Sequence, residues 1–64
     1  MPIIDVTLFE GRDVATKRAL VERLTAAAAE SLAVPAASVT VVLREIARHD
    51  LAEGGVLFAE RERA

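Results

Sequence analysis

The sequence predicts an α+β fold, in which a β-α-β unit with a parallel two-stranded sheet is followed by a short C-terminal hairpin. Residues 3–9 and 39–46 are rich in β-branched side chains, which is typical of strands. The alanine-rich segment 14–33 between them contains no glycine or proline and predicts a helix. A helical connection is long enough for parallel pairing of the two strands. Gly54-Gly55 predicts a tight turn near the end of the chain.

The chain is small for the hydrophobic content that it carries. Its 64 residues are expected to form one domain, residues 1–64, and a chain of this size buries only about 60% of its unfolded surface. It has no cysteine, so no disulfide can add stability, yet 53% of its residues are hydrophobic. We therefore expect the protein to form an oligomer.

Charge and composition argue against several classes of function. The net charge is −2, the basic residues form no stripe, and the only aromatic residues are Phe9 and Phe58, so we expect no nucleic-acid partner. With one histidine and no cysteine, we expect no metal site and no cofactor. The N-terminus has no signal-peptide pattern, and Glu30 and Pro35 interrupt the weakly polar stretch 24–43. We therefore expect no membrane association and a cytoplasmic location.

The first strand, residues 3–9, carries apolar side chains on both faces, so both faces are expected to be covered. Gly11 supplies the backbone freedom for the turn that follows. Asp13 is a suitable N-cap for the helix, because its charge suits the positive end of the helix dipole.

The helix expected over residues 14–33 has an apolar stripe at i, i+3, i+4 spacing. The stripe consists of Leu20, Leu24, Ala27, Ala28, Ser31 and Leu32. Pro35 ends the helical stretch. Because one helix covers only one face of a two-stranded sheet, we expect the other face to meet another subunit.

The C-terminal part is expected to be irregular. Residues 47–53 predict a polar connector with a helical turn, and residues 56–58 predict a short edge strand or hairpin. We expect residues 56–58 to dock on a neighbouring protomer, and residues 59–64 to form a charged tail.

Met1-Pro2 offers an unusual base. If Met1 is cleaved, the chain begins with a secondary amine that can accept and return a proton. If Met1 stays, the same nitrogen is an amide with no basicity and no N–H. The alternative is that Pro2 only opens a strand, where proline is well tolerated.

Two arginines are candidates for binding an anion. Arg12 lies at the strand-to-helix turn, where a guanidinium can bind a carboxylate bidentately with help from the backbone amides of the first helical turn. The alternative is a solvated loop arginine. Arg44 lies in an otherwise apolar strand, where an unpaired buried arginine is costly. It either contacts a ligand or forms an ion pair with Glu10, with Asp5 or with an acid of a neighbouring subunit.

Taken together, these features resemble the 4-oxalocrotonate tautomerase family, nearly end to end and without a gap. The proline start, the Glu-Gly-Arg turn and the 64-residue length are together the specific part of the match. The residues that carry the resemblance are Met1-Pro2-Ile3, Leu8-Phe9-Glu10-Gly11-Arg12, Lys17, Leu20, Glu30-Ser31-Leu32, Ser38-Val39, Glu45 and Gly54-Gly55.

The resemblance implies a protomer that dimerises and assembles as a hexamer, a trimer of dimers, with one or two kinds of chain. It implies that Met1 is removed and that Pro2 is the general base of an isomerase. This tautomerase would move a proton on an unsaturated 2-hydroxy or 2-oxo acid, in aromatic degradation. Arg12 falls at the position of a family arginine that grips a substrate carboxylate, and Phe9 at a position whose backbone amide faces the substrate.

Two positions depart from the family pattern. Thr40 stands where the family usually has a second arginine, supplied by a neighbouring subunit, and Leu51 stands where it has a phenylalanine wall. Leu51 keeps that wall apolar but reshapes it. We expect Arg44, on the same strand face and roughly 6.5 Å from Thr40 by strand rise, to take over part of the role of the missing arginine.

Two other functions stay open. The arginine at Arg44 also resembles one subunit type of the chloroacrylic acid dehalogenases, so a hydratase or dehalogenase acting on unsaturated acids is one alternative. Thr40 in place of an arginine also suits a non-catalytic subunit of a heterohexamer, in which the active site belongs to a partner chain.

Overall fold

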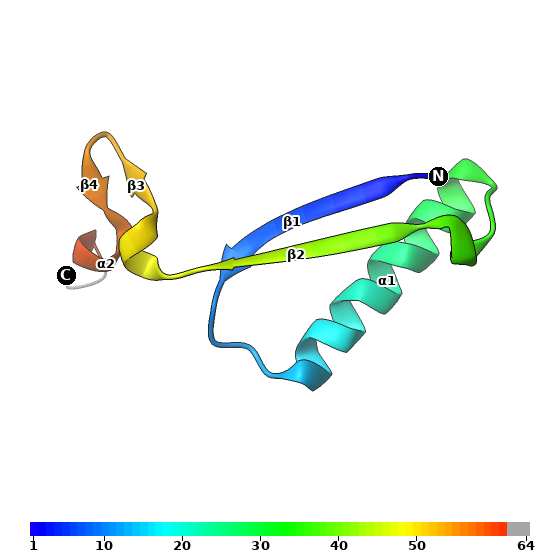
Figure 1. Cartoon of the computed structure of the whole chain (residues 1–64), viewed down its shortest axis with the longest axis horizontal. Coiled ribbons are helices and arrows are strands. Elements are labelled where there is room, and N and C mark those ends of the chain that lie inside the picture. Colours follow the sequence, from blue (N-terminus) through cyan, green and yellow to red (C-terminus); the bar gives the residue numbers. More distant parts are fainter. Residues whose placement is uncertain (62–64) are drawn as a thin grey trace.

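The computed structural model describes residues 1–61 of the chain and has the predicted architecture (Figure 1). The two long strands pair in parallel, with Ile3 opposite Thr40 and Phe9 opposite Ile46, and the two short strands form an antiparallel hairpin. The elements in order are β1 (Ile3–Phe9), α1 (Val14–Leu32), a 3₁₀ turn (Ala36–Ser38), β2 (Thr40–Ile46), a second 3₁₀ turn (Arg48–Asp50), β3 (Ala52–Glu53), β4 (Val56–Leu57) and α2 (Phe58–Arg61).

Both ends of α1 are capped as the local sequence requires. The side chain of Asp13 accepts a hydrogen bond of 2.9 Å from the backbone N–H of Thr16. Hydrogen bonds from Thr16 also lower the pKa of Asp13, since they favour its charged form. At the other end Ala33 takes the left-handed conformation with φ 56° and donates its N–H to the carbonyl of Ala29. The helix therefore ends at Leu32, one residue before the predicted end.

Helix α1 covers one face of the two-stranded sheet. Along β1 burial alternates, with half-buried side chains on the helix side and exposed ones on the other side. Lys17 of α1 forms an ion pair of 2.6 Å with Glu45 of β2, and this pair joins the start of the helix to the far end of the strand. The half-buried side chains of β1 on the helix side are Ile4, Val6 and Leu8, and the exposed ones are Ile3, Asp5 and Thr7.

The predicted apolar stripe of α1 is only partly right. Leu20, Leu24 and Ala28 are half-buried as expected, but Ala27, Ser31 and Leu32 are exposed. The packed face includes instead the half-buried Val21, Thr25 and Ala29. Because alanine side chains contribute little contact area, their spacing does not decide which side of a helix faces the sheet. The ion pair between Lys17 and Glu45 helps to orient it.

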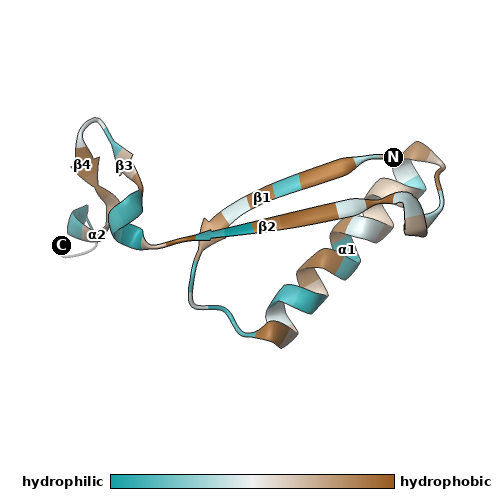
Figure 2. Ribbon diagram, viewed as in Figure 1, coloured by the Kyte–Doolittle hydropathy of each residue, from teal (hydrophilic) through white to brown (hydrophobic). Residues whose placement is uncertain are grey.

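The chain leaves an unusual amount of apolar surface open. None of the hydrophobic side chains in residues 1–61 is fully buried, and Ile3 on the uncovered sheet face is 57% exposed. The accessible surface is 4738 Å², whereas a compact monomer of this mass exposes about 4,000 Å². Hydrophobic segments run along most of β1 and β2 (Figure 2). This surface supports the expectation that another chain covers the sheet.

The C-terminal segment packs on its own chain as well as forming the predicted hairpin. The N–H of Phe58 donates to the carbonyl of Leu51 at 2.8 Å, and this bond turns α2 back toward β1. The rings of Phe58 and Phe9 then lie 4.7 Å apart. Phe58 thus contacts its own chain, while Val56 is 41% exposed, and the docking of residues 56–58 on a neighbouring protomer stays a prediction.

The last strand ends at Leu57, one residue before the predicted end, and Phe58 begins the short helix α2, which includes residues 59–61 of the predicted tail. Residues 62–64 of that prediction lie outside the described residues. None of the helices in residues 1–61 combines the length and the apolar character needed to cross a bilayer.

Candidate active site

An apolar pocket of about 300 Å³ lies where β1 and β2 end. The parallel register places Phe9 opposite Ile46 at this end of the sheet, and Leu51 closes the pocket from the connector after β2. Two of the predicted site residues, Phe9 and Leu51, are thus brought together although they are distant in the sequence. The side chains that line the pocket are Thr7, Leu8, Phe9, Ile46 and Leu51.

Arg12 lies beside this pocket because of the turn that follows β1. Gly11 has a φ of 124°, a conformation that a residue with a side chain rarely adopts. The turn allows Nη1 of Arg12 to donate to the carbonyl oxygen of Phe9 at 3.1 Å. This bond joins the exposed arginine to the backbone of a pocket-lining residue, and it uses only one of the five N–H donors of the guanidinium.

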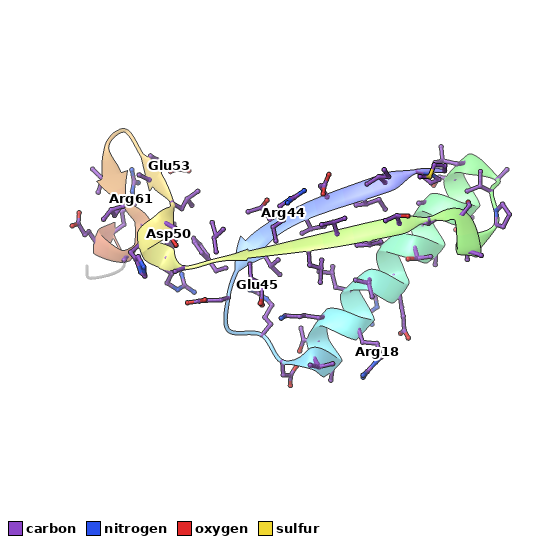
Figure 3. All side chains as sticks on the ribbon, in the orientation of Figure 1. Arg18, Arg44, Glu45, Asp50, Glu53 and Arg61 are labelled. Atoms are coloured by element: carbon purple, nitrogen blue, oxygen red, sulfur yellow. The ribbon has the colours of Figure 1, made fainter. Side chains whose placement is uncertain are left out.

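Arg44 lies on the uncovered face of the sheet, opposite Thr7 in the register. Its Nη2 is 3.3 Å from Oδ1 of Asp5, so the ion pair that the sequence allowed is formed. The two side chains are 63% and 55% exposed, and ion pairs this exposed contribute about 0–1 kcal/mol. In Figure 3 Arg44 and Glu45 lie on opposite sides of β2. Because Arg44 lies opposite Thr7, which lines the pocket, Arg44 is next to the pocket. Its exposed ion pair with Asp5 holds it only weakly.

The expected distance of 6.5 Å between Arg44 and Thr40 is wrong. Neighbouring positions on one strand face are two steps apart, whereas Arg44 follows Thr40 by four steps of β2, or about 13 Å. Thr40 lies opposite Ile3, at the start of the sheet, whereas Arg44 lies toward the pocket.

Pro2 directly precedes β1, so it lies at the opposite end of the sheet from the pocket; Figure 1 shows the N-terminus at this end of β1. Its carbonyl accepts a hydrogen bond of 3.0 Å from the N–H of Thr40. Phe9 follows Pro2 by seven steps of extended chain, or about 23 Å. Met1 is 82% exposed to solvent in the single chain. The structure therefore does not bring Pro2 together with Arg12, Phe9 and Leu51 within one chain.

The sequence analysis did not identify Arg48 and Phe58 as residues near the pocket. The guanidinium of Arg48 lies over the ring of Phe9 at 4.6 Å and near the ring of Phe58 at 5.8 Å. The Phe58 ring in turn packs on Phe9. The only sequence signal was that the two phenylalanines are the sole aromatic residues of the chain, which gives no indication that they meet.

Two acidic side chains besides Asp5 form ion pairs with basic ones. Glu45 pairs with Lys17, and Glu53 lies 3.9 Å from Arg61 at the hairpin. Within residues 1–61, no three histidine, cysteine, aspartate or glutamate side chains come together as a possible metal site.

Comparisons with known proteins match nearly the whole chain. A family model described as "Tautomerase enzyme" matches residues 2–61. Probable tautomerase RSp0893 of Ralstonia nicotianae is 48% identical over 46 residues, which are 72% of this chain and 66% of that protein. TomN, a 4-oxalocrotonate tautomerase homologue in the tomaymycin biosynthetic pathway, is 43% identical with a TM-score of 0.93, over 98% of this chain and 97% of that one. A heterohexameric 4-oxalocrotonate tautomerase from Chloroflexus aurantiacus J-10-fl is 35% identical with a TM-score of 0.87, over 94% and 97% of the two chains.

Proposed function

Because the chain belongs to the tautomerase family, we propose that it is a tautomerase that uses the amine of Pro2 as general base on an unsaturated 2-hydroxy or 2-oxo acid. The observation that carries this proposal is the apolar pocket formed by Phe9 and Leu51, with Arg12 fixed beside it. An apolar pocket with few polar groups at its edge suits a small carbon chain that ends in a carboxylate.

We further propose that each active site combines two chains. Since about 23 Å of strand separate Pro2 from Phe9, Pro2 of one protomer must meet the pocket of another. The lack of fully buried hydrophobic side chains in residues 1–61 supports an assembly of several chains. The heterohexameric relative from Chloroflexus supports a hexamer, for which the sequence predicts a trimer of dimers.

In the proposed reaction, the neutral nitrogen of Pro2 accepts a proton from the substrate and returns it at a carbon of the resulting dienolate. Arg12 binds the carboxylate, and the backbone N–H of Phe9 faces the substrate. Leu51 forms the apolar wall. Arg44, released from Asp5, stabilises the negative charge that develops on oxygen.

The proposed base has to be unprotonated at working pH. Ordinary α-amino groups titrate at about 7.7–8.0, and a pyrrolidine nitrogen is intrinsically more basic. Nearby arginine charge and an apolar wall both disfavour its charged form and so lower its pKa. The arginine that lowers the pKa of the base also stabilises the dienolate, so one arrangement serves both steps.

A second candidate is a non-catalytic subunit of a heterohexamer. Thr40 stands where the family usually has its second arginine, and the Chloroflexus relative is a heterohexamer. A hydratase or dehalogenase acting on unsaturated acids is a third candidate function, and only Arg44 supports it. A cytoplasmic location and a role in aromatic degradation stay predictions from the family resemblance.

Ultraviolet monitoring of 2-hydroxymuconate and phenylenolpyruvate tests the proposal. Intact mass first establishes that Met1 has been removed. The processed protein is expected to isomerise at least one of the two compounds. A folded, processed protein that is inactive alone but active after mixing with a partner chain would favour the non-catalytic subunit. Chloride release from 3-chloroacrylate without isomerisation would favour the dehalogenase.

A further inference from the structure

We propose that Thr7 is a further substrate-binding residue, whose hydroxyl group holds the 2-oxygen of a 2-hydroxy or 2-oxo acid in the pocket. The inference rests on the proposed function for its substrate class, and it starts from the composition of the pocket wall. Among the lining residues in the described part of the chain, Thr7 alone has a polar side chain, and the others are Leu8, Phe9, Ile46 and Leu51.

The hydroxyl group of Thr7 is available to a ligand. Thr7 is exposed in β1, and within residues 1–61 its side chain forms no hydrogen bond with another residue. A ligand that covers a polar group without giving it a hydrogen bond loses affinity, because that group gives up its bonds to water. A ligand with an oxygen at this point avoids that loss, so the pocket favours an oxygenated carbon chain over a hydrocarbon one.

The sheet places Thr7 near both arginines that are assigned to the substrate. Phe9, whose carbonyl accepts a bond from Arg12 at 3.1 Å, follows Thr7 by two steps on the same face of β1, or about 6.5 Å. Arg44 is opposite Thr7 in the parallel register. A short acid whose carboxylate meets Arg12 can therefore present an oxygen further along its chain to Thr7, on the strand pair that also carries Arg44.

A hydroxyl group suits the 2-oxygen in both tautomers of the substrate. It rotates, and it can both donate and accept hydrogen bonds, whereas a guanidinium only donates. In the enol form the hydroxyl of Thr7 accepts a hydrogen bond from the 2-hydroxyl of the substrate, and in the keto form it donates one to the 2-carbonyl. Arg44 has no acceptor for the enol proton and is paired with Asp5 at 3.3 Å. We therefore assign recognition of the 2-oxygen to Thr7, while the proton is moved by Pro2.

The test compares three C6 diacids that differ only at C2: adipate, 2-oxoadipate and 2-hydroxyadipate, the last as its tighter-binding enantiomer. Calorimetry on the processed full chain is expected to show both oxygenated acids binding about three- to tenfold more tightly than adipate, as one net hydrogen bond implies. Thr7→Val keeps the branched shape of the side chain and replaces its hydroxyl group by a methyl group. It should lose both preferences with adipate affinity unchanged, whereas Thr7→Ser should keep both.

Arg44→Met is the matched control, because it removes the donor opposite Thr7 and leaves the hydroxyl group in place. It should keep the preference for 2-hydroxyadipate, whose hydroxyl proton a guanidinium cannot accept. Equal binding of all three acids by the wild type, unchanged preferences in Thr7→Val, or loss of the 2-hydroxyadipate preference in Arg44→Met instead would each overturn the assignment. Equal weakening of all three acids by Thr7→Val would also overturn it, because Thr7 would then only shape the pocket.

This binding test separates the role of Thr7 from the proposed reaction. A protein that isomerises its substrate but keeps both preferences in Thr7→Val contradicts the role of Thr7 and leaves the reaction in place. A protein that prefers the oxygenated acids through Thr7 but catalyses nothing supports that role and contradicts the reaction.

Discussion

Retention of Met1 is expected to lower kcat/KM for 2-hydroxymuconate by about 10²–10⁴-fold, the range that a general base contributes. With Met1 in place the nitrogen of Pro2 belongs to an amide and cannot accept a proton. Met1 is 82% exposed, so its removal requires no unfolding of the chain. Processed and unprocessed forms, separated by intact mass, would be compared in the same ultraviolet assay.

Pro2→Ala is the companion variant, because it replaces a secondary amine by a primary one at the same end of β1. We expect a large loss of kcat, whereas the neighbouring Ile3→Val should keep wild-type kcat. Activity of Pro2→Ala equal to that of the wild type would reject Pro2 as the base. Full activity of a protein that keeps Met1 would also reject Pro2 as the base.

Arg12→Ala is expected to raise KM for dicarboxylates by about 10–100-fold, as loss of a charged hydrogen bond of roughly 1.5–3 kcal/mol implies. Arg12 is fixed beside the pocket by its bond to the carbonyl of Phe9, so the loss falls on substrate binding. Arg12→Lys should recover part of the loss because it restores the charge without the planar, bidentate geometry. Initial rates over a range of substrate concentrations would separate KM from kcat.

Arg18→Ala is the matched control for Arg12→Ala. Arg18 is an exposed arginine of α1 whose side chain points away from the sheet (Figure 3), and it does not line the pocket. Its replacement should leave KM unchanged. If Arg12→Ala also left KM for dicarboxylates unchanged, Arg12 would be removed from the carboxylate-binding role.

Much of the fold could be predicted because it depends on local signals. The β-branched run that became β1 has its predicted bounds, and Asp13 caps α1 through a bond to Thr16 three residues away. Gly11 has the positive φ that its turn requires. Each of these features is decided by side chains within one turn or one strand.

The candidate site could be predicted only in part, because its contacts join distant segments. The resemblance to a family singled out Phe9, Arg12 and Leu51; the structure places Phe9 and Leu51 at one pocket, and Arg12 donates a hydrogen bond to the carbonyl of Phe9. The stacking of Arg48 on Phe9 depends on how the C-terminal hairpin folds back, and no local pattern specifies that.

The positions of Pro2 and Arg44 relative to the pocket could not be predicted from sequence spacing alone. Only the parallel register shows that Pro2 and the pocket lie at opposite ends of the sheet, and that Arg44 lies toward the pocket end. The same register keeps Pro2 away from Arg12 and Phe9 within one chain, so the proposed site has to combine two chains.

Subunit mixing tests this central claim most directly. Pro2→Ala and Arg12→Ala chains would be unfolded together in equal amounts, refolded, and assayed below KM, with hybrid oligomers confirmed by native mass spectrometry. If each site combines Pro2 of one chain with Arg12 of a symmetric partner, about a quarter of the sites regain both residues and activity returns to that level. Pro2→Ala mixed with the Pro2→Ala/Arg12→Ala double variant should stay inactive. Hybrid oligomers with no more activity than the separate variants would contradict a site shared between chains.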